Sequence, residues 1–237
     1  MFIGYSTGAV AFGDFRLALD RLAPLRLHGV ELSALRAPEL APLIDALDTL
    51  DLQAYEYVSI HAPSRYAASE EKSIIAQLQK IAETGWPIIC HPDSISNPRA
   101  WAEFGSSLCF ENMDKRKPIG RTADELELVF GRFPMAKFCI DLGHAWQIDR
   151  TMSEASEMIR RFHDRIIQVH VSEVNTNSEH KQLTRASVTA FNKVVQQIPV
   201  DATWIIESVI ENQFAIVREV EFLQESLGRH DVSLIPD

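Results

Sequence analysis

Residues 137–163 read KFCIDLGHAWQIDRTMSEASEMIRRFH, and this stretch contains one complete strand–helix unit. Residues 137–140 form a short apolar run typical of a buried strand, and Asp141 follows it directly. Residues 153–163 carry apolar side chains at helical spacing. The stretch therefore predicts a parallel strand that ends in a polar side chain and is covered by a helix.

The same unit recurs along the whole chain. The predicted strands are residues 2–6, 29–32, 57–60, 87–90, 107–110, 137–140, 166–169 and 203–206. The predicted helices are residues 14–25, 38–50, 69–84, 98–104, 122–130, 153–163, 187–197 and 213–227. Eight units, with no glycine-rich phosphate-binding motif after the first strand, favour a closed (β/α)8 TIM barrel over an open doubly wound sheet. Since 237 residues is close to the length of one such barrel, residues 1–237 are predicted to be a single domain.

The composition is that of an acidic globular protein, with 46% hydrophobic residues, 24% charged residues and a formal net charge of −10. This charge provides no general attraction to nucleic acid or to an anionic membrane, although bound cations could make one cleft positive. The sequence has no apolar run of about 20 residues and no signal peptide before the first strand. Cys90, Cys109 and Cys139 lie in apolar runs, which favours free thiols in a reducing compartment. We therefore expect a cytoplasmic protein.

Imidazole and carboxylate side chains follow six successive predicted strands. These residues are His61, His91, Glu111, Asp141 with His144 three positions later, His170 with His180 in the next loop, and Glu207. Because the carboxyl ends of barrel strands meet at one mouth, the side chains should converge. Imidazole and carboxylate are ligands that zinc, manganese and iron favour. Since one ion needs only about four to six ligands, eight candidates predict more than one ion, with Glu111 as a bridge.

Each of these residues alone also has a structural explanation. A histidine at a strand end is usually structural, Asp141 could cap a helix, and Glu207 could pair with an arginine. Such explanations do not account for the recurrence at six successive strand ends. The remaining histidines lie on predicted helices or turns and are expected to be structural: His28, His163 and His230.

The strand-end segments resemble the xylose isomerase-like barrel superfamily and, within it, the endonuclease IV family. The matching motifs are Ile60-His61-Ala62-Pro63, Cys90-His91-Pro92, Phe110-Glu111-Asn112-Met113, Ile140-Asp141-Leu142-Gly143-His144-Ala145, His170-Val171-Ser172-Glu173 and Ile206-Glu207. The resemblance covers nearly the whole chain.

The resemblance implies a site with three zinc ions. The implied ligand sets are His61, His91 and Glu111 for the first ion, Glu111, Asp141, His170 and Glu207 for the second, and His144 and His180 for the third. The family's further ligand to the third ion is an Asp two positions before His180, where this chain has Ser178. The number of ions is therefore two or three, and manganese or iron would also suit these donors.

The same resemblance implies a phosphoesterase that cleaves abasic DNA or a smaller phosphate-containing substrate. Arg36 and Tyr66 follow the second and third strands, where the family places side chains that enter DNA, although either could be an ordinary loop residue. Lys115 begins the basic run 115–117 after the fifth strand and could steer a phosphate, although such runs are usually just solvated.

The sugar isomerases and ketose 3-epimerases are the alternative branch. They bind one divalent ion at the positions of Glu111, Asp141, His170 and Glu207, with the two glutamates exchanging a proton and His144 touching the substrate. Glu31, which ends the second strand, resembles a feature of sugar-acting members and is therefore a predicted substrate contact.

Two usual epimerase features are replaced here. Residues 115–117 stand where a glutamate is expected, and Asn175 and Asn177 stand where an arginine is expected. His61, His91 and His180 would also be surplus for one ion. A redox-active iron site is a third option. We therefore expect a metal-dependent hydrolase, with an isomerase or epimerase as the alternative.

Overall fold

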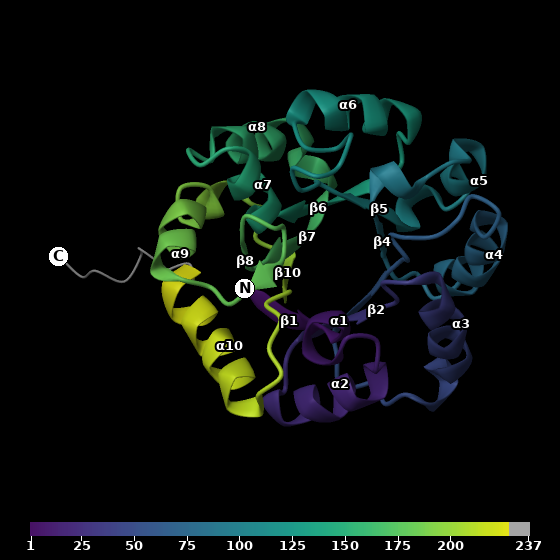
Figure 1. Cartoon of the computed structure of the whole chain (residues 1–237), viewed down its shortest axis with the longest axis horizontal. Helices are drawn as coiled ribbons and strands as arrows, with labels where there is room; N and C mark the ends of the chain where they lie inside the picture. The colour runs from purple at the N-terminus through teal and green to yellow at the C-terminus, as the bar shows by residue number, and fades with distance from the viewer. Residues whose placement is uncertain (228–237) are drawn as a thin grey trace.

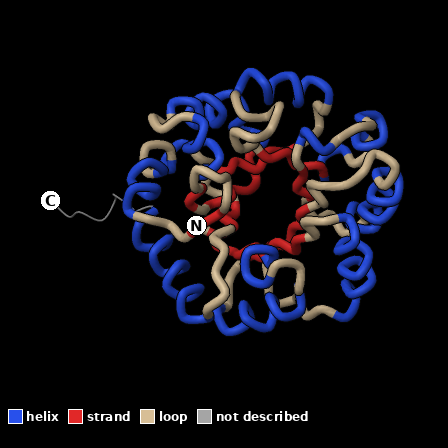
Figure 2. The backbone as a smooth tube through the Cα atoms, in the orientation of Figure 1, coloured by secondary structure: helices blue, strands red, loops and turns tan. Residues whose placement is uncertain are grey.

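Eight parallel strands close on themselves in the order β1-β10-β7-β6-β5-β4-β3-β2, inside a ring of helices (Figure 1, Figure 2). The computed structural model describes residues 1–227. The barrel strands are β1 Phe2–Ser6, β2 Gly29–Ser33, β3 Tyr57–His61, β4 Ile88–Cys90, β5 Leu108–Glu111, β6 Lys137–Asp141, β7 Ile166–Val171 and β10 Thr203–Ile206. The predicted (β/α)8 fold is confirmed. His230 lies outside the described residues, and the single domain over 1–237 stays a prediction.

The helices also follow the predicted order. They are α1 Thr7–Ala11, α2 Phe15–Leu22, α3 Ala37–Ala46, α4 Glu71–Ala82, α5 Pro98–Ala102, α6 Ala123–Arg132, α7 Leu142–Ile148, α8 Ser153–Phe162, α9 Arg185–Phe191 and α10 Gln213–Leu227. The helices predicted over 14–25 and 187–197 both finish as separate 3-10 turns, Ala23–Leu25 and Val195–Gln197.

Three elements near the barrel mouth were not predicted: α1, α7 and the hairpin of β8 Glu173–Val174 and β9 His180–Lys181. With five and seven residues, the two helices are too short to show a helical period. Asp141 starts α7, because its Oδ1 accepts a hydrogen bond of 2.6 Å from the amide of His144. These short elements add side chains to the mouth beyond those at the strand ends.

The barrel interior has a small apolar layer directly below the polar strand ends. Side chains alternate along a strand, so the residue two positions before each strand-end ligand candidate points the same way. Ile89, Cys109 and Cys139 occupy such positions and pack together, fully buried. The three predicted free thiols are free and buried. Apolar packing thus forms a dry floor under the polar groups.

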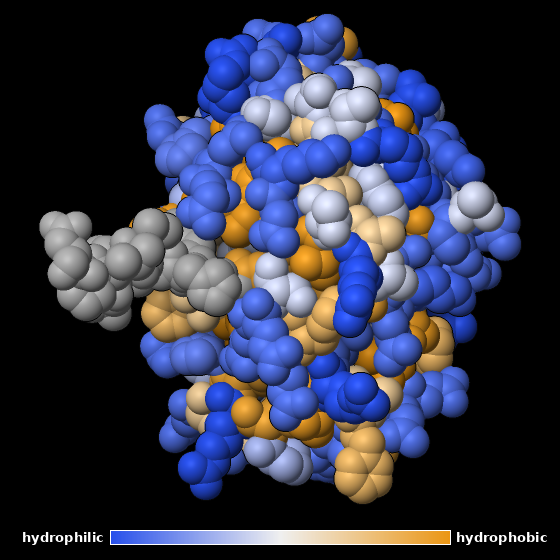
Figure 3. Space-filling model, turned by 90° about the vertical axis from the view of Figure 1, so that its left-hand side faces the viewer, coloured by the Kyte–Doolittle hydropathy of each residue, from blue (hydrophilic) through white to orange (hydrophobic). Residues whose placement is uncertain are grey.

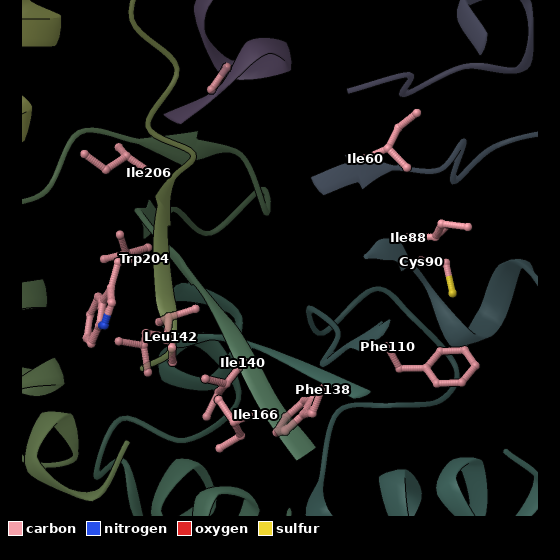
Figure 4. Packing of buried hydrophobic residues seen from close by; sticks show 14 of the residues in the cluster. Ile60, Ile88, Cys90, Phe110, Phe138, Ile140, Leu142, Ile166, Trp204 and Ile206 are labelled. Carbon is pink, nitrogen blue, oxygen red and sulfur yellow. The ribbon is translucent and has the colours of Figure 1, made fainter. Parts of the chain in front are cut away.

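The outward faces of the strands pack against the helices in a larger apolar layer. Figure 4 shows members of this layer around the strands, including Phe110, Ile140 and Trp204. Phe138 on β6 lies edge-on to Phe130 of α6 and to Phe162 of α8, with ring centroids 5.8 Å and 6.0 Å apart. Burial of large aromatic rings between sheet and helices holds the barrel closed.

The opposite faces of the helices are polar. On the face in Figure 3, the described side chains are mainly hydrophilic, with smaller hydrophobic areas between them. This is the pattern of amphipathic helices that bury one side only. Within residues 1–227, no helix has the length and apolar character needed to cross a membrane.

Replacing Phe138 with Ala should lower the free energy of unfolding by about 3–5 kcal/mol, because it leaves a cavity between β6, α6 and α8. Leu128→Ala is the matched control on α6, since Leu128 is 66% exposed, and it should change stability by less than about 0.5 kcal/mol. Urea unfolding measures both. Equal losses in the two variants would contradict this packing.

Candidate metal centre

Three side chains at the ends of β3, β4 and β5 face one another. His61 ends β3, His91 directly follows β4, and Glu111 ends β5. Oε2 of Glu111 lies 3.4 Å from Nε2 of His61 and 3.2 Å from Nε2 of His91. The two imidazole rings meet edge to face. Their ligand atoms lie within 4.8 Å of one another, so this group could hold a metal ion.

A second group shares Glu111 with the first. It adds Asp141 at the end of β6, His170 on β7 and Glu207 after β10. Nδ1 of His170 lies 3.5 Å from Oε1 of Glu111 and 3.3 Å from Oε2 of Glu207. The ligand atoms of this group also lie within 4.8 Å of one another. Glu111 therefore presents one oxygen to each group.

The third group combines Asp141 with His144 on α7 and His180 on β9. Nδ1 of His144 lies 3.4 Å from Oδ2 of Asp141. His180 is held by a hydrogen bond of 2.8 Å between its Nδ1 and the hydroxyl of Ser172. All eight strand-end candidates predicted from the sequence thus fall into these three groups.

The loop before His180 does not supply the carboxylate expected there. Ser178 lines the cavity, and its hydroxyl donates to Oε1 of Gln147 at 3.0 Å. Glu179 is exposed and forms an ion pair of 3.0 Å with Lys181. Glu179 therefore does not take the place of an aspartate at position 178.

The chemistry of the three groups fits divalent cations. Oδ2 of Asp141 and Nδ1 of His170 are buried without a hydrogen-bond partner among the described residues. Leaving such atoms unpaired in a dry interior costs free energy, and a cation would compensate them. The donors are imidazole nitrogens and carboxylate oxygens, which suit zinc, manganese and iron.

Two histidines are oriented with a nitrogen free for an ion. The carbonyl oxygen of Ala62 can only accept, so Nδ1 of His61 donates to it, at 2.9 Å, and Nε2 faces Glu111, where it can bind an ion once it is deprotonated. The carboxylate of Glu31 accepts from Nε2 of His170 at 2.9 Å, so Nδ1 of His170 faces the second group. Such partners fix the tautomer and ring orientation of metal-ligating histidines.

Glu31 lies below the site and does not line the cavity. It is a predicted substrate contact because it resembles a feature of sugar-acting members. Glu31 instead lies within β2, which runs to Ser33, and is fully buried. Its Oε2 also accepts from Nε2 of Gln168 at 2.7 Å, and Tyr57 donates to Oε1 of Gln168 at 2.8 Å. This buried chain supports His170 from beneath.

Asn112 joins the ends of two strands. Its Nδ2 donates to the carbonyl of Asp141 at 2.9 Å, and its Oδ1 accepts from the amide of Asp141 at 2.7 Å. Its own carbonyl accepts from Nδ1 of His144 at 2.9 Å. Asn112 and Gln168 were not singled out from the sequence. Two sequence features could have indicated them. Asn112 directly follows Glu111, and Gln168 lies two residues before His170 on the same strand.

Burial shifts the pKa values of the carboxyl groups upward. Burial, together with the negative charge of Glu111, raises the pKa of Glu207 to about 8. Burial also raises the pKa of Asp141 to about 6, against the lowering effect of His144. Each upward shift means that the ionised carboxylate is buried without enough neighbouring positive charge to stabilise it.

The histidines shift in opposite directions. Burial disfavours the charged form of His61 and His144, but neighbouring carboxylates outweigh it and raise their pKa values to about 9 and about 10. For His180, burial and the positive charge of His144 lower the pKa to about 3. The site without ions therefore holds several protons at neutral pH.

A cavity of about 430 Å³ opens over the three groups. Its floor includes His61, His91, Glu111 and Glu207. Arg36, a predicted substrate contact, lines it. Its volume is in the range typical of small-molecule sites.

Tyr66 and Lys115, the other two predicted substrate contacts, do not line the cavity. Tyr66 is half-buried against the core, and its hydroxyl donates to the carbonyl of Ser94 at 2.6 Å. The side chain of Lys115 is exposed.

No protein-family profile and no curated protein matches the chain. Solved structures do. Endonuclease IV from Thermus thermophilus is 17% identical with a TM-score of 0.64 and covers 97% of this chain and 100% of its own. A xylose isomerase domain protein from Alicyclobacillus acidocaldarius is 12% identical with a TM-score of 0.63, covering 96% and 99%.

The chain shares the (β/α)8 barrel fold of these structures. A further structure with this fold is the 3-keto-D-glucoside 4-epimerase YcjR from E. coli, 12% identical, with a TM-score of 0.62 and coverage of 95% and 99%. At these identities the likeness establishes the fold and leaves the reaction open, since one barrel hosts many chemistries.

Zinc binding at pH 7 should release more than one proton per chain. Without ions, His61, His144 and Glu207 hold protons at pH 7, because their pKa values are about 9, 10 and 8. Only the deprotonated side chains can bind zinc, so binding must displace these protons. The number released should fall as pH rises through the three pKa values, because fewer of the side chains are then protonated. Calorimetry in buffers of different ionisation enthalpy counts the protons. Zinc binding at pH 7 without proton release would contradict the prediction.

Proposed function

We propose that this chain is a divalent-metal-dependent phosphoesterase with a site for two or three ions. The position of Glu111 carries the proposal. Its Oε2 lies 3.4 Å and 3.2 Å from His61 and His91, while its Oε1 lies 3.1 Å and 3.5 Å from His144 and His170. A carboxylate whose two oxygens face separate donor groups is suited to bridge two ions.

The proposed ligands follow the three groups. His61, His91 and Glu111 would hold one ion, and Glu111, Asp141, His170 and Glu207 would hold a second. Asp141, His144 and His180 would hold a third where it binds. Zinc is the first choice for these donors, and manganese or iron would also suit them. Bound divalent ions supply Lewis acidity, which neutralises charge on phosphate oxygens and makes water a stronger acid.

In the proposed reaction, water adds to phosphorus, the bond from phosphorus to the leaving alcohol oxygen breaks, and the alcohol takes up a proton. The chain contributes by fixing its imidazoles before substrate arrives. The carbonyl of Ala62 orients His61, and Glu31 orients His170. The dry apolar layer beneath keeps the local dielectric low, which strengthens electrostatic interactions at the mouth.

A one-ion isomerase or epimerase is the second candidate, because the group of Glu111, Asp141, His170 and Glu207 is complete. In that reaction Glu111 and Glu207 would exchange a proton with a ketose. The contacts of Oε2 of Glu111 with His61 and His91 count against it, since these contacts leave Glu111 less free to act as a base. Solvent deuterium incorporation into a ketose would favour this candidate.

Replacing His91 with Ala should reduce phosphoester cleavage by more than about 100-fold, because loss of an outer-shell partner alone typically costs about 10- to 100-fold. His163→Ala is the control, since His163 is exposed and remote from the cavity. Circular dichroism should show both variants folded. Undiminished cleavage by folded His91→Ala protein would contradict the proposed function.

A further inference from the structure

The cationic side chains around the cavity differ in whether they are already paired with a carboxylate. Four cationic side chains line it: Arg36, Arg65, Arg116 and Lys117. Three of them are paired with carboxylates, namely Arg36 with Glu39, Arg116 with Asp114 and Lys117 with Asp93. Arg65 is exposed and has neither an ion pair nor a side-chain hydrogen bond within residues 1–227. It is therefore the cation on this wall that is free to bind an anion.

Arg65 is also held close to the metal-ligand candidates by its backbone. It lies four residues after His61, and it forms a parallel bridge with Arg36, which follows β2. An arginine with an unpaired guanidinium recognises phosphate through two parallel hydrogen bonds. Its place suits the anionic part of a substrate whose reacting atoms lie over the metal groups.

An exposed aromatic ring lines the same cavity. Phe12 is 54% exposed and has a φ of 48°, a left-handed backbone conformation that is unusual for a bulky residue. Gly13 follows with a φ of 105°, and a Cβ there would lie 2.8 Å from Glu39. A strained backbone that presents an apolar ring to solvent at a cavity mouth suggests a role in binding.

Phe12 sits on a fixed support. The preceding helix α1 lies inside the ring of outer helices in Figure 1. Thr7 accepts a hydrogen bond of 2.8 Å from the amide of Ser33, and the carbonyl of Ala9 accepts one of 3.2 Å from the amide of Ile210. Leu35 and Val209 line the cavity as well. The cavity therefore has an apolar part, formed by Phe12, Leu35 and Val209, in addition to Arg65, the cation left unpaired within residues 1–227.

These features fit a small ligand better than a polyanion. The net charge is −10 and three of the four cationic side chains at the cavity are already paired, so the side chains beyond the metal groups offer little positive potential to a nucleic acid backbone. Tyr66 is tied to Ser94 and packed against the core, so it is not free to enter a duplex.

We propose that the substrate is a small phosphate ester with an aromatic or other apolar group, and that Arg65 and Phe12 select it. This inference rests on the proposed phosphoesterase function. Arg65 binds the anionic phosphate, and Phe12 packs against the apolar group. Neither residue belongs to the metal groups, so both act on substrate binding.

The test compares two diesters with the same leaving group, bis(p-nitrophenyl) phosphate and methyl p-nitrophenyl phosphate. Wild-type protein should prefer the first by about tenfold in kcat/KM. Arg65→Gln should raise KM for both diesters about tenfold with little change in kcat. Phe12→Ala should lower kcat/KM for the aryl diester about three- to tenfold and remove the preference.

Matched controls are available on α10, whose residues do not line the cavity. Arg218→Gln and Phe214→Ala replace an exposed arginine and a phenylalanine that is 81% exposed. Both should behave as wild type. If Arg65→Gln and Phe12→Ala match these controls while diesters are cleaved, or if an abasic duplex is cleaved better than the aryl diester, this inference is overturned and the phosphoesterase function stands.

Binding of phenylphosphonate, which has no ester bond to cleave, separates the two proposals. Calorimetry on the metal-loaded protein should show about tenfold weaker binding for Arg65→Gln than for Arg218→Gln. If this difference is seen but no phosphoester is cleaved, the recognition by Arg65 stands and the phosphoesterase function fails. If phenylphosphonate binds equally to both variants, the inference fails.

Discussion

The molecule depends on one electrostatic constraint, which is that eight largely buried ionisable side chains share the barrel mouth. Glu111 is almost fully buried and has four histidine nitrogens within 3.5 Å. Buried carboxylates and imidazoles in these numbers need charge compensation, and the upward pKa shift of Glu207 shows where it is lacking. Divalent cations would supply that compensation, and their Lewis acidity would give the site its proposed chemistry.

The barrel creates this constraint through strand alternation. Every second side chain of a strand points into the barrel. The polar side chains at the strand ends therefore lie directly above an apolar layer that contains Ile89, Cys109 and Cys139. Below His170 the layer is polar instead. Glu31 and Gln168 form a buried hydrogen-bonded pair there, which fixes the imidazole from beneath. Packing and hydrogen bonding therefore set the site before any ligand arrives.

The strands could be predicted because each is a short apolar run that is visible in the local sequence. The strand-end candidates followed, because residues after the strands of a barrel meet at its mouth. The burial of Glu31 could not be predicted, because it depends on contacts with Gln168 and His170, which are far away in sequence. Helix α1 is too short to show a helical period, so the sequence did not predict that Phe12 would lie at the cavity. That Arg65 has no ion pair among the described residues could not be predicted either, because it depends on which carboxylates pair with the neighbouring cations. The reaction also lies beyond sequence pattern, since structures of an endonuclease and an epimerase share this fold.

Metal content per chain tests the central claim most directly. Protein purified without a chelating tag would be analysed by inductively coupled plasma mass spectrometry, beside the His91→Ala variant. The bridging position of Glu111 predicts two or three zinc or manganese ions per chain, with at least one lost in the variant. One ion per chain that survives in His91→Ala protein would contradict the account, because His61 and His91 would then be structural.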